Sequence, residues 1–176
     1  NLDLYQNTLT FIIILVSYLS IVGLAVKKKK DIVIVTLLFL WHTLFSIGYF
    51  LFSLSNPSDA KAYFFRSIAN ESFRFYPGSP FMQYFASFFT AGFFETNYLN
   101  TTLILNLVGS SGLVLLYLSV KDYLKLIPWY WVLILFIPSM SFWTGSLGKD
   151  AFSFASVCLL IYSTTKVRRT ALYIPL

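Results

Sequence analysis

The chain has 176 residues, of which 57% are hydrophobic, 20% are aromatic and only 11% are charged. Soluble domains carry about 25% charged residues, so this chain lacks the polar side chains that would cover a water-facing surface. Its formal net charge is +6, but the positive residues lie in clusters between apolar runs, which argues against a nucleic-acid partner and indicates a membrane protein. The single cysteine, Cys158, excludes an internal disulfide framework.

Five apolar runs predict membrane-spanning helices, because about 20 helical residues cross a hydrocarbon core of about 30 Å. The expected spans cover residues 8–26, 32–54, 101–120, 127–143 and 151–165. The predicted fold class is therefore all-α, a polytopic transmembrane helical bundle in one domain covering residues 1–176. A new apolar stretch begins where the chain stops, so we expect a part of a longer protein whose carboxy-terminal spans are missing.

The distribution of basic residues predicts the orientation, because lysine and arginine near span ends mark the cytoplasmic side. With the lysine run 27–30 placed inside, three separate clusters agree. The basic residues expected inside are Lys27, Lys28, Lys29, Lys30, Lys121, Lys125, Lys166, Arg168 and Arg169. Those expected outside are Lys61, Arg66, Arg74 and Lys149. We therefore expect the amino terminus and residues 55–100 and 144–150 to be extracytoplasmic, in a bacterial inner membrane.

The polar interval after the second span predicts a short helix that carries candidate functional side chains on one face. Asn56 is the expected N-cap and Pro57 the first helical residue, which puts Asp59 at the third position, where a carboxylate can bond back to the cap. A helical stripe then carries Asp59, Tyr63, Arg66 and Asn70. Asp59 has two compatible interpretations, a capping group and a catalytic or acceptor-binding carboxylate.

The arginines beyond Asp59 have two interpretations. Arg66 and Arg74 are expected either to contact lipid headgroups or to bind a phosphate or diphosphate, which guanidinium groups match well.

An aromatic stretch follows the turn at residues 76–80. Its aromatic side chains recur at helical spacing over residues 81–94, which predicts a helix lying in the outer interface. The alternative is a sixth span, which would break the charge rule downstream.

Several residues inside the spans stand out. His42 lies deep in the second span, where a histidine bonded to a neighbouring helix is favoured over a proton relay. Gly109 and Gly112 predict close helix packing in the third span, and Pro138 predicts a kink in the fourth.

The loop over residues 143–150 is a second candidate site. Its glycines allow backbone to approach a ligand, the following helix start favours anions, and Lys149 adds positive charge. The alternative is an ordinary turn with a lysine that reaches the interface.

Together these segments resemble GT-C-type polytopic membrane glycosyltransferases that use polyprenyl-phosphate sugars. The resemblance is carried by Ser58-Asp59 with Tyr63 in a first large outer loop, by the aromatic helices after it, and by the later Phe142-Trp143-Thr144-Gly145-Ser146-Leu147-Gly148-Lys149-Asp150. The chain departs from that family in having about five spans rather than eight or more, and a single acid where some members have a pair.

The resemblance implies a membrane enzyme with a lipid-linked sugar donor and a glycan or lipid acceptor. Asp59 would be the catalytic acid group, and Arg66, Arg74 and Lys149 would hold the phosphate, with Tyr63 and Asp150 beside them as substrate-binding residues. The need for a divalent metal stays open. Two alternatives are a polymerase of lipid-linked polysaccharide repeat units and, ranked last, part of a transporter.

Overall fold

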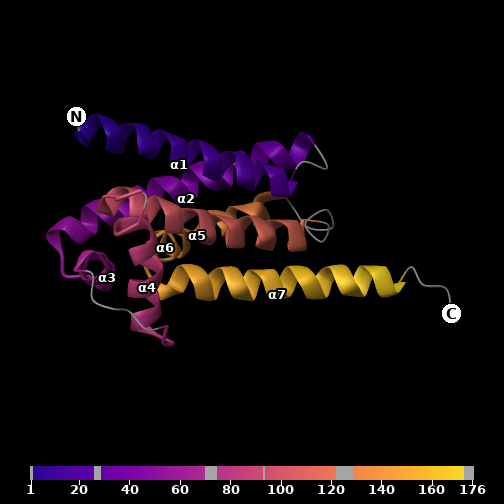
Figure 1. Cartoon of the computed structure of the whole chain (residues 1–176). Helices are drawn as coiled ribbons and strands as arrows, with labels where there is room; N and C mark the ends of the chain where they lie inside the picture. The colour runs from indigo at the N-terminus through magenta and orange to yellow at the C-terminus, as the bar shows by residue number, and fades with distance from the viewer. Residues whose placement is uncertain (1, 26–28, 70–74, 93, 122–128, 173–176) are drawn as a thin grey trace.

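The computed structural model describes residues 2–25, 29–69, 75–92, 94–121 and 129–172, and within these ranges every regular element is a helix (Figure 1). The elements are α1 (Leu2–Ala25), α2 (Lys29–Ser55), α3 (Asp59–Ile68), α4 (Ser79–Thr90), α5 (Tyr98–Val120), η2 (Trp129–Phe136), α6 (Pro138–Thr144) and α7 (Lys149–Leu172). The predicted all-α class is confirmed.

Three helices are long and apolar enough to cross a membrane: α1, the Asp31–Ser55 part of α2, and α5. The 24 residues of α1 extend over about 36 Å, more than the hydrocarbon core of a bilayer. These helices correspond to the first three expected spans.

The fourth expected span is not one continuous helix in the described residues. It consists of a 3-10 helix, η2, and a short α-helix, α6, and at the break between them Ile137 has extended backbone (φ −65°, ψ 119°). Pro138 lacks an N–H and its ring clashes with the preceding turn, so it starts a new helix instead of continuing η2. The sequence predicted a kink at Pro138, and the structure instead has a break between two separate helices.

The fifth expected span lies within α7, which is 24 residues long but carries charged residues at both ends. Among the described helices, only α1, α2 and α5 combine sufficient length with sufficient apolarity.

The central helix of the bundle is α5, which packs against α1, α2 and α7 (Figure 1). Its buried face is rich in small and polar side chains, including Thr101, Asn106 and Ser110, each at most 1% exposed. Leu105 and Leu113 of α5 are buried beside them, while the surrounding helices expose large apolar side chains, such as Phe11 of α1 at 67% and Leu160 of α7 at 65% exposed. Such a surface suits a hydrocarbon environment and would be unfavourable in water.

Two small residues of α5 allow its neighbours to approach closely, as the sequence predicted. A Cβ at Gly109 would collide with the Thr144 carbonyl oxygen and would lie 2.7 Å from the His42 ring. A Cβ at Gly112 would lie 2.8 Å from the Cα of Ala155 on α7. The backbone packing of α5 against α6 and α7 therefore depends on these glycines.

The helices α3 and α4 pack on each other at one end of the bundle, where α4 runs across the long helices (Figure 1). The turn before α4 requires Gly78, whose φ is +98°. With 12 residues α4 is too short to cross a bilayer, so the alternative of a sixth span is excluded for this helix. Its buried face carries Met82, Gln83, Ala86 and Thr90. Phe81 and Phe85 are partly buried against Phe152 of α7, and Phe88 is exposed.

Candidate functional site

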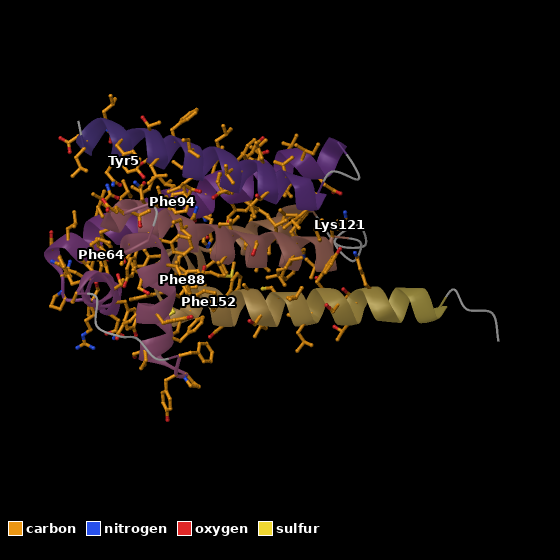
Figure 2. All side chains as sticks on the ribbon, viewed as in Figure 1. Tyr5, Phe64, Phe88, Phe94, Lys121 and Phe152 are labelled. Carbon is orange, nitrogen blue, oxygen red and sulfur yellow. The ribbon has the colours of Figure 1, made fainter. Side chains whose placement is uncertain are left out.

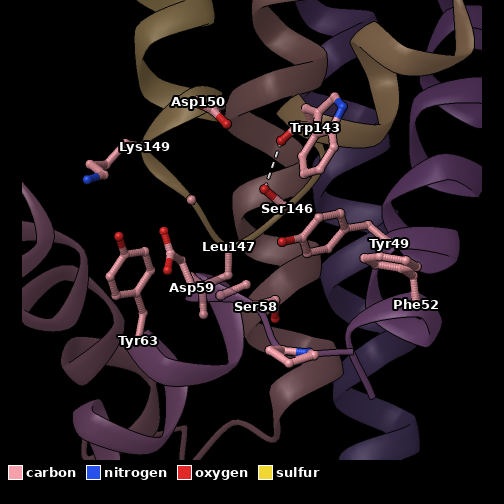
Figure 3. Close-up of a pocket in the computed structure, with 13 residues that line it drawn as sticks. Tyr49, Phe52, Ser58, Asp59, Tyr63, Trp143, Ser146, Leu147, Lys149 and Asp150 are labelled. Carbon is pink, nitrogen blue, oxygen red and sulfur yellow. Dashed lines mark hydrogen bonds between the residues drawn. The ribbon is translucent and has the colours of Figure 1, made fainter. Parts of the chain in front are cut away.

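A pocket of about 640 Å³ lies at this end of the bundle, between the end of α2, the start of α3 and the segment that joins α6 to α7 (Figure 3). It brings together two segments that are about 90 residues apart in the chain. The lining residues are Tyr49, Phe52, Pro57, Ser58, Asp59, Ala60, Tyr63, Trp143, Ser146, Leu147, Gly148, Lys149 and Asp150. The four predicted site residues Asp59, Tyr63, Lys149 and Asp150 thus share one pocket.

The predicted start of α3 was wrong. The N-cap is Ser58, whose backbone is extended and whose Oγ accepts a hydrogen bond from the Lys61 N–H at 3.3 Å. Asn56 instead ends α2, because its amide donates to the Phe52 carbonyl oxygen at 2.8 Å. Asp59 is therefore the first helical residue and not the third.

This shift changes the interpretation of Asp59. Its carboxylate is exposed and accepts no hydrogen bond from the described residues, so the capping interpretation loses its support. It sits in the first turn of α3, where the helix dipole favours a negative charge. In Figure 3 it points into the pocket, toward the same side as the Tyr63 hydroxyl. An unpaired carboxylate in such a place is available to accept a proton or a hydroxyl hydrogen bond.

Ser79 connects Tyr63 to Lys149. The Tyr63 hydroxyl lies 3.2 Å from Ser79 Oγ, and the Lys149 ammonium donates to the same oxygen at 3.4 Å. Tyr63 is only 4% exposed, so packing fixes its ring, whereas Lys149 is exposed. In the described part of the chain no ion pair joins Lys149 to either pocket carboxylate, and its positive charge is therefore available to a ligand.

Aromatic rings form the other wall of the pocket. Tyr49 lies edge-on to Trp143 with ring centroids 5.9 Å apart, and Phe52 lies one turn further along α2. Trp143 is 51% and Phe52 is 44% exposed, so the wall continues onto the apolar outer surface. The pocket therefore has a polar side and an apolar side, a combination typical of small-molecule sites.

The remaining predicted residues do not join this site in the described structure. Arg66 is exposed on α3 and does not line the pocket. Arg74 and Asn70 lie outside the described residues. Within the described ranges no group of three or more histidine, cysteine, aspartate or glutamate side chains is arranged to hold a metal ion.

His42 forms hydrogen bonds that hold the segment leading into the pocket. Its Nδ1 lies 2.6 Å from Asn106 Oδ1 on α5, and its Nε2 lies 3.0 Å from Thr144 Oγ1 at the end of α6. The next residue, Gly145, accepts a hydrogen bond through its carbonyl oxygen from Ser46 Oγ at 2.7 Å. The predicted bond from His42 to a neighbouring helix is confirmed, and the network fixes the backbone from which the pocket segment 146–150 continues.

The sequence reasoning missed the aromatic wall and Ser79. Tyr49 and Phe52 look like ordinary members of an apolar span, and only their position in the last two turns of α2, beside the polar interval, could have indicated them.

The chain matches no protein-family model, no curated protein and no solved structure in the comparisons made with each.

Proposed function

We propose that the protein is an integral membrane glycosyltransferase that transfers a sugar from a polyprenyl-phosphate donor to an acceptor on the extracytoplasmic side. The observation that carries the proposal is the convergence of Asp59, Tyr63, Lys149 and Asp150 on one pocket with an aromatic wall. In this account η2 with α6 and α7 complete five passes. The pocket end faces outward, because the described basic positions Lys29, Lys30, Lys121 and Lys166 lie toward the opposite ends of α2, α5 and α7.

The chemistry follows from the nature of the donor. The acceptor hydroxyl oxygen attacks the anomeric carbon, the bond from that carbon to the phosphate oxygen breaks, and the lipid phosphate leaves with the electron pair. Asp59 takes the hydroxyl proton as general base, a role that typically contributes a factor of 10² to 10⁴. Lys149 and the first backbone N–H groups of α7 stabilise the charge on the leaving phosphate.

The other lining residues have positioning roles. The aromatic wall of Tyr49, Phe52 and Trp143 holds the apolar part of the donor, and its exposed side lets the lipid tail remain in the membrane. Asp150 accepts hydrogen bonds from sugar hydroxyls, because an ionised carboxylate offers only acceptors. Arg66 lies outside the pocket, and its role in this proposal is to contact lipid headgroups.

The two alternatives fit the pocket less well. A polymerase of repeat units would bind a diphosphate, which needs more positive charge than one lysine beside two carboxylates. A transporter would present an available ionisable group beside a broken helix at mid-membrane. The helix break at Pro138 is present, but both ring nitrogens of His42 are bonded.

A transfer assay in native-like membranes tests the proposal. Labelled polyprenyl-phosphate sugars are supplied to wild type, Asp59→Asn and Lys149→Ala, with Asp3→Asn and Lys61→Ala as variants that remove the same charges elsewhere. We expect transfer to fall by at least about 10²-fold for Asp59→Asn and to stay near wild type in both controls. Wild type that transfers no sugar from any such donor would refute the proposal, and extension of diphosphate-linked repeats would favour the polymerase.

A further inference from the structure

Ser79 does not line the Asp59 pocket, yet its hydroxyl contacts two residues that do. The Lys149 ammonium lies 3.4 Å and the Tyr63 hydroxyl 3.2 Å from Ser79 Oγ. Ser79 is the first residue of α4, whereas Tyr63 belongs to α3 and Lys149 begins α7. One hydroxyl group therefore joins three helices at the edge of the pocket.

Packing holds Ser79 at this place. Met82, in the first turn of α4, is fully buried, and the ring of Phe81 lies 5.3 Å from the ring of Phe152 on α7. Figure 2 shows Phe152 at the start of α7, beside α4. Phe81 follows Ser79 by two residues and Phe152 follows Lys149 by three, so this aromatic contact keeps the starts of α4 and α7 adjacent.

The directions of the two hydrogen bonds follow from the donors that each group has. An ammonium can only donate, so Lys149 donates to Ser79 Oγ and occupies one of its lone pairs. This bond polarises the serine hydroxyl and makes it the stronger donor toward Tyr63. Ser79 therefore donates to the Tyr63 hydroxyl oxygen, and the phenolic hydrogen of Tyr63 is left with no acceptor among the described residues.

The groups that this arrangement leaves available at the pocket are hydrogen-bond donors. Tyr63 is only 4% exposed, yet it lines the pocket, and in Figure 3 its hydroxyl points toward Lys149. In the part of the chain that the structure describes, Lys149 forms no ion pair with Asp59 or Asp150, and it has N–H donors beyond the one given to Ser79. Neighbouring donors that carry one positive charge match the oxygens of a phosphodiester, which carry one negative charge and can only accept.

Given the proposed function, on which this inference rests, we propose that Tyr63 donates a hydrogen bond to the phosphate of the lipid-linked donor. Ser79 is the positioning residue, because it directs the phenolic hydrogen and holds Lys149 beside it. A lysine on a long side chain would follow the phosphate to several positions. The buried phenol instead fixes one phosphate oxygen relative to Asp59, and with it the bond that breaks.

Variants that leave every charge in place test the two hydroxyl groups. Tyr63→Phe removes the phenolic donor and keeps the ring, and its control is Tyr84→Phe, which removes a phenol of α4 that does not line the pocket. Ser79→Ala removes the positioning hydroxyl, and Ser79→Thr keeps one. Ser87→Ala is the control for Ser79→Ala, because the Ser87 hydroxyl donates only to the Tyr84 carbonyl oxygen within α4.

The measurement is retention of polyprenyl phosphate against the matching polyprenol by the purified full chain, read by native mass spectrometry from mixed micelles. We expect wild type to prefer the phosphate, and Tyr63→Phe to reduce that preference about tenfold, as for a lost hydrogen bond to a charged group. Ser79→Ala should reduce it less, Ser79→Thr should restore it, and both controls should match wild type. A structural disturbance alone would weaken the retention of both lipids and leave their ratio unchanged.

Equal retention of the two lipids by wild type would overturn the proposal, and so would a wild-type preference in both Tyr63→Phe and Ser79→Ala. Displacement of the lipid by millimolar inorganic phosphate would also overturn it, because it would identify a site for free phosphate. The sugar-transfer assay is read separately. A phosphate preference that Tyr63→Phe lowers, in a protein that transfers no sugar, would support the phosphate contact and refute the transferase. Sugar transfer with a preference that neither variant changes would do the reverse.

Discussion

Gly112 brings α5 against α7 at a distance that leaves no room for a side chain. A Cβ there would lie 2.8 Å from the Cα and 3.2 Å from the backbone nitrogen of Ala155. Carbon atoms in favourable contact are about 3.5–4.0 Å apart, so Gly112→Ala must push α7 outward by roughly 1 Å. Such overpacking costs about 1–3 kcal/mol, and alanine recovers about 1 kcal/mol of helix propensity. We expect a net loss of about 1 kcal/mol in the contact between the two helices.

Cys158 can report this change, because it is the single cysteine in the chain and lies on α7 three residues beyond Ala155. Its side chain is 2% exposed, so a maleimide reacts only when α7 moves away. A loss of about 1 kcal/mol raises the open population, and therefore the labelling rate, about fivefold. In Gly48→Ala, where a Cβ meets open space, labelling should not accelerate. Labelling of Gly112→Ala at or below the wild-type rate would refute the described packing of α7.

Two further substitutions test the polar contacts between helices. His42→Ala removes hydrogen bonds to α5 and α6 from a fully buried site, so the free energy of unfolding should fall by about 3 kcal/mol, measured as a lower thermal midpoint. Leu44→Ala, on the exposed face of α2, should change the midpoint little. Equal midpoints for the two variants would contradict the hydrogen-bond network. Asn100→Ala removes the hydrogen bonds that Asn100 makes with Gln6 and Thr10, so the first turns of α1 should exchange their amide hydrogens faster. Unchanged exchange would show that these bonds do not hold α1 in place.

The long helices could be predicted from the sequence because apolar length alone requires them. The spans expected at 8–26, 32–54 and 101–120 correspond to α1, α2 and α5. Local chemistry also placed an irregularity at Pro138, which has no N–H to donate: a kink was predicted, and the structure has a break between two helices. The candidate residues Asp59 and Lys149 were found for a similar reason, since charged residues are rare in this chain and stand out between apolar runs.

Tertiary contacts could not be predicted in the same way. The sequence indicated Asn56 as the N-cap of α3, whereas the structure has Ser58 there, because the position of the cap depends on how far α2 continues, which packing decides. Nothing in the spacing of Asn106 and Thr144 shows that both meet His42, because they lie on different helices. The meeting of Asp59 with Lys149 in one pocket likewise depends on how α3 and α7 are arranged around α5.

The central claim is that the pocket of Asp59 and Lys149 holds a lipid-linked phosphate with its tail along the aromatic wall. A polyprenyl phosphate with a photoreactive group on its first isoprene unit tests it most directly, with the labelled residues located by mass spectrometry. We expect label on Tyr49, Phe52 or Trp143, and a large reduction in Lys149→Ala. Label spread over the exposed faces of α1 and α7, and unaffected by Lys149→Ala, would contradict the account.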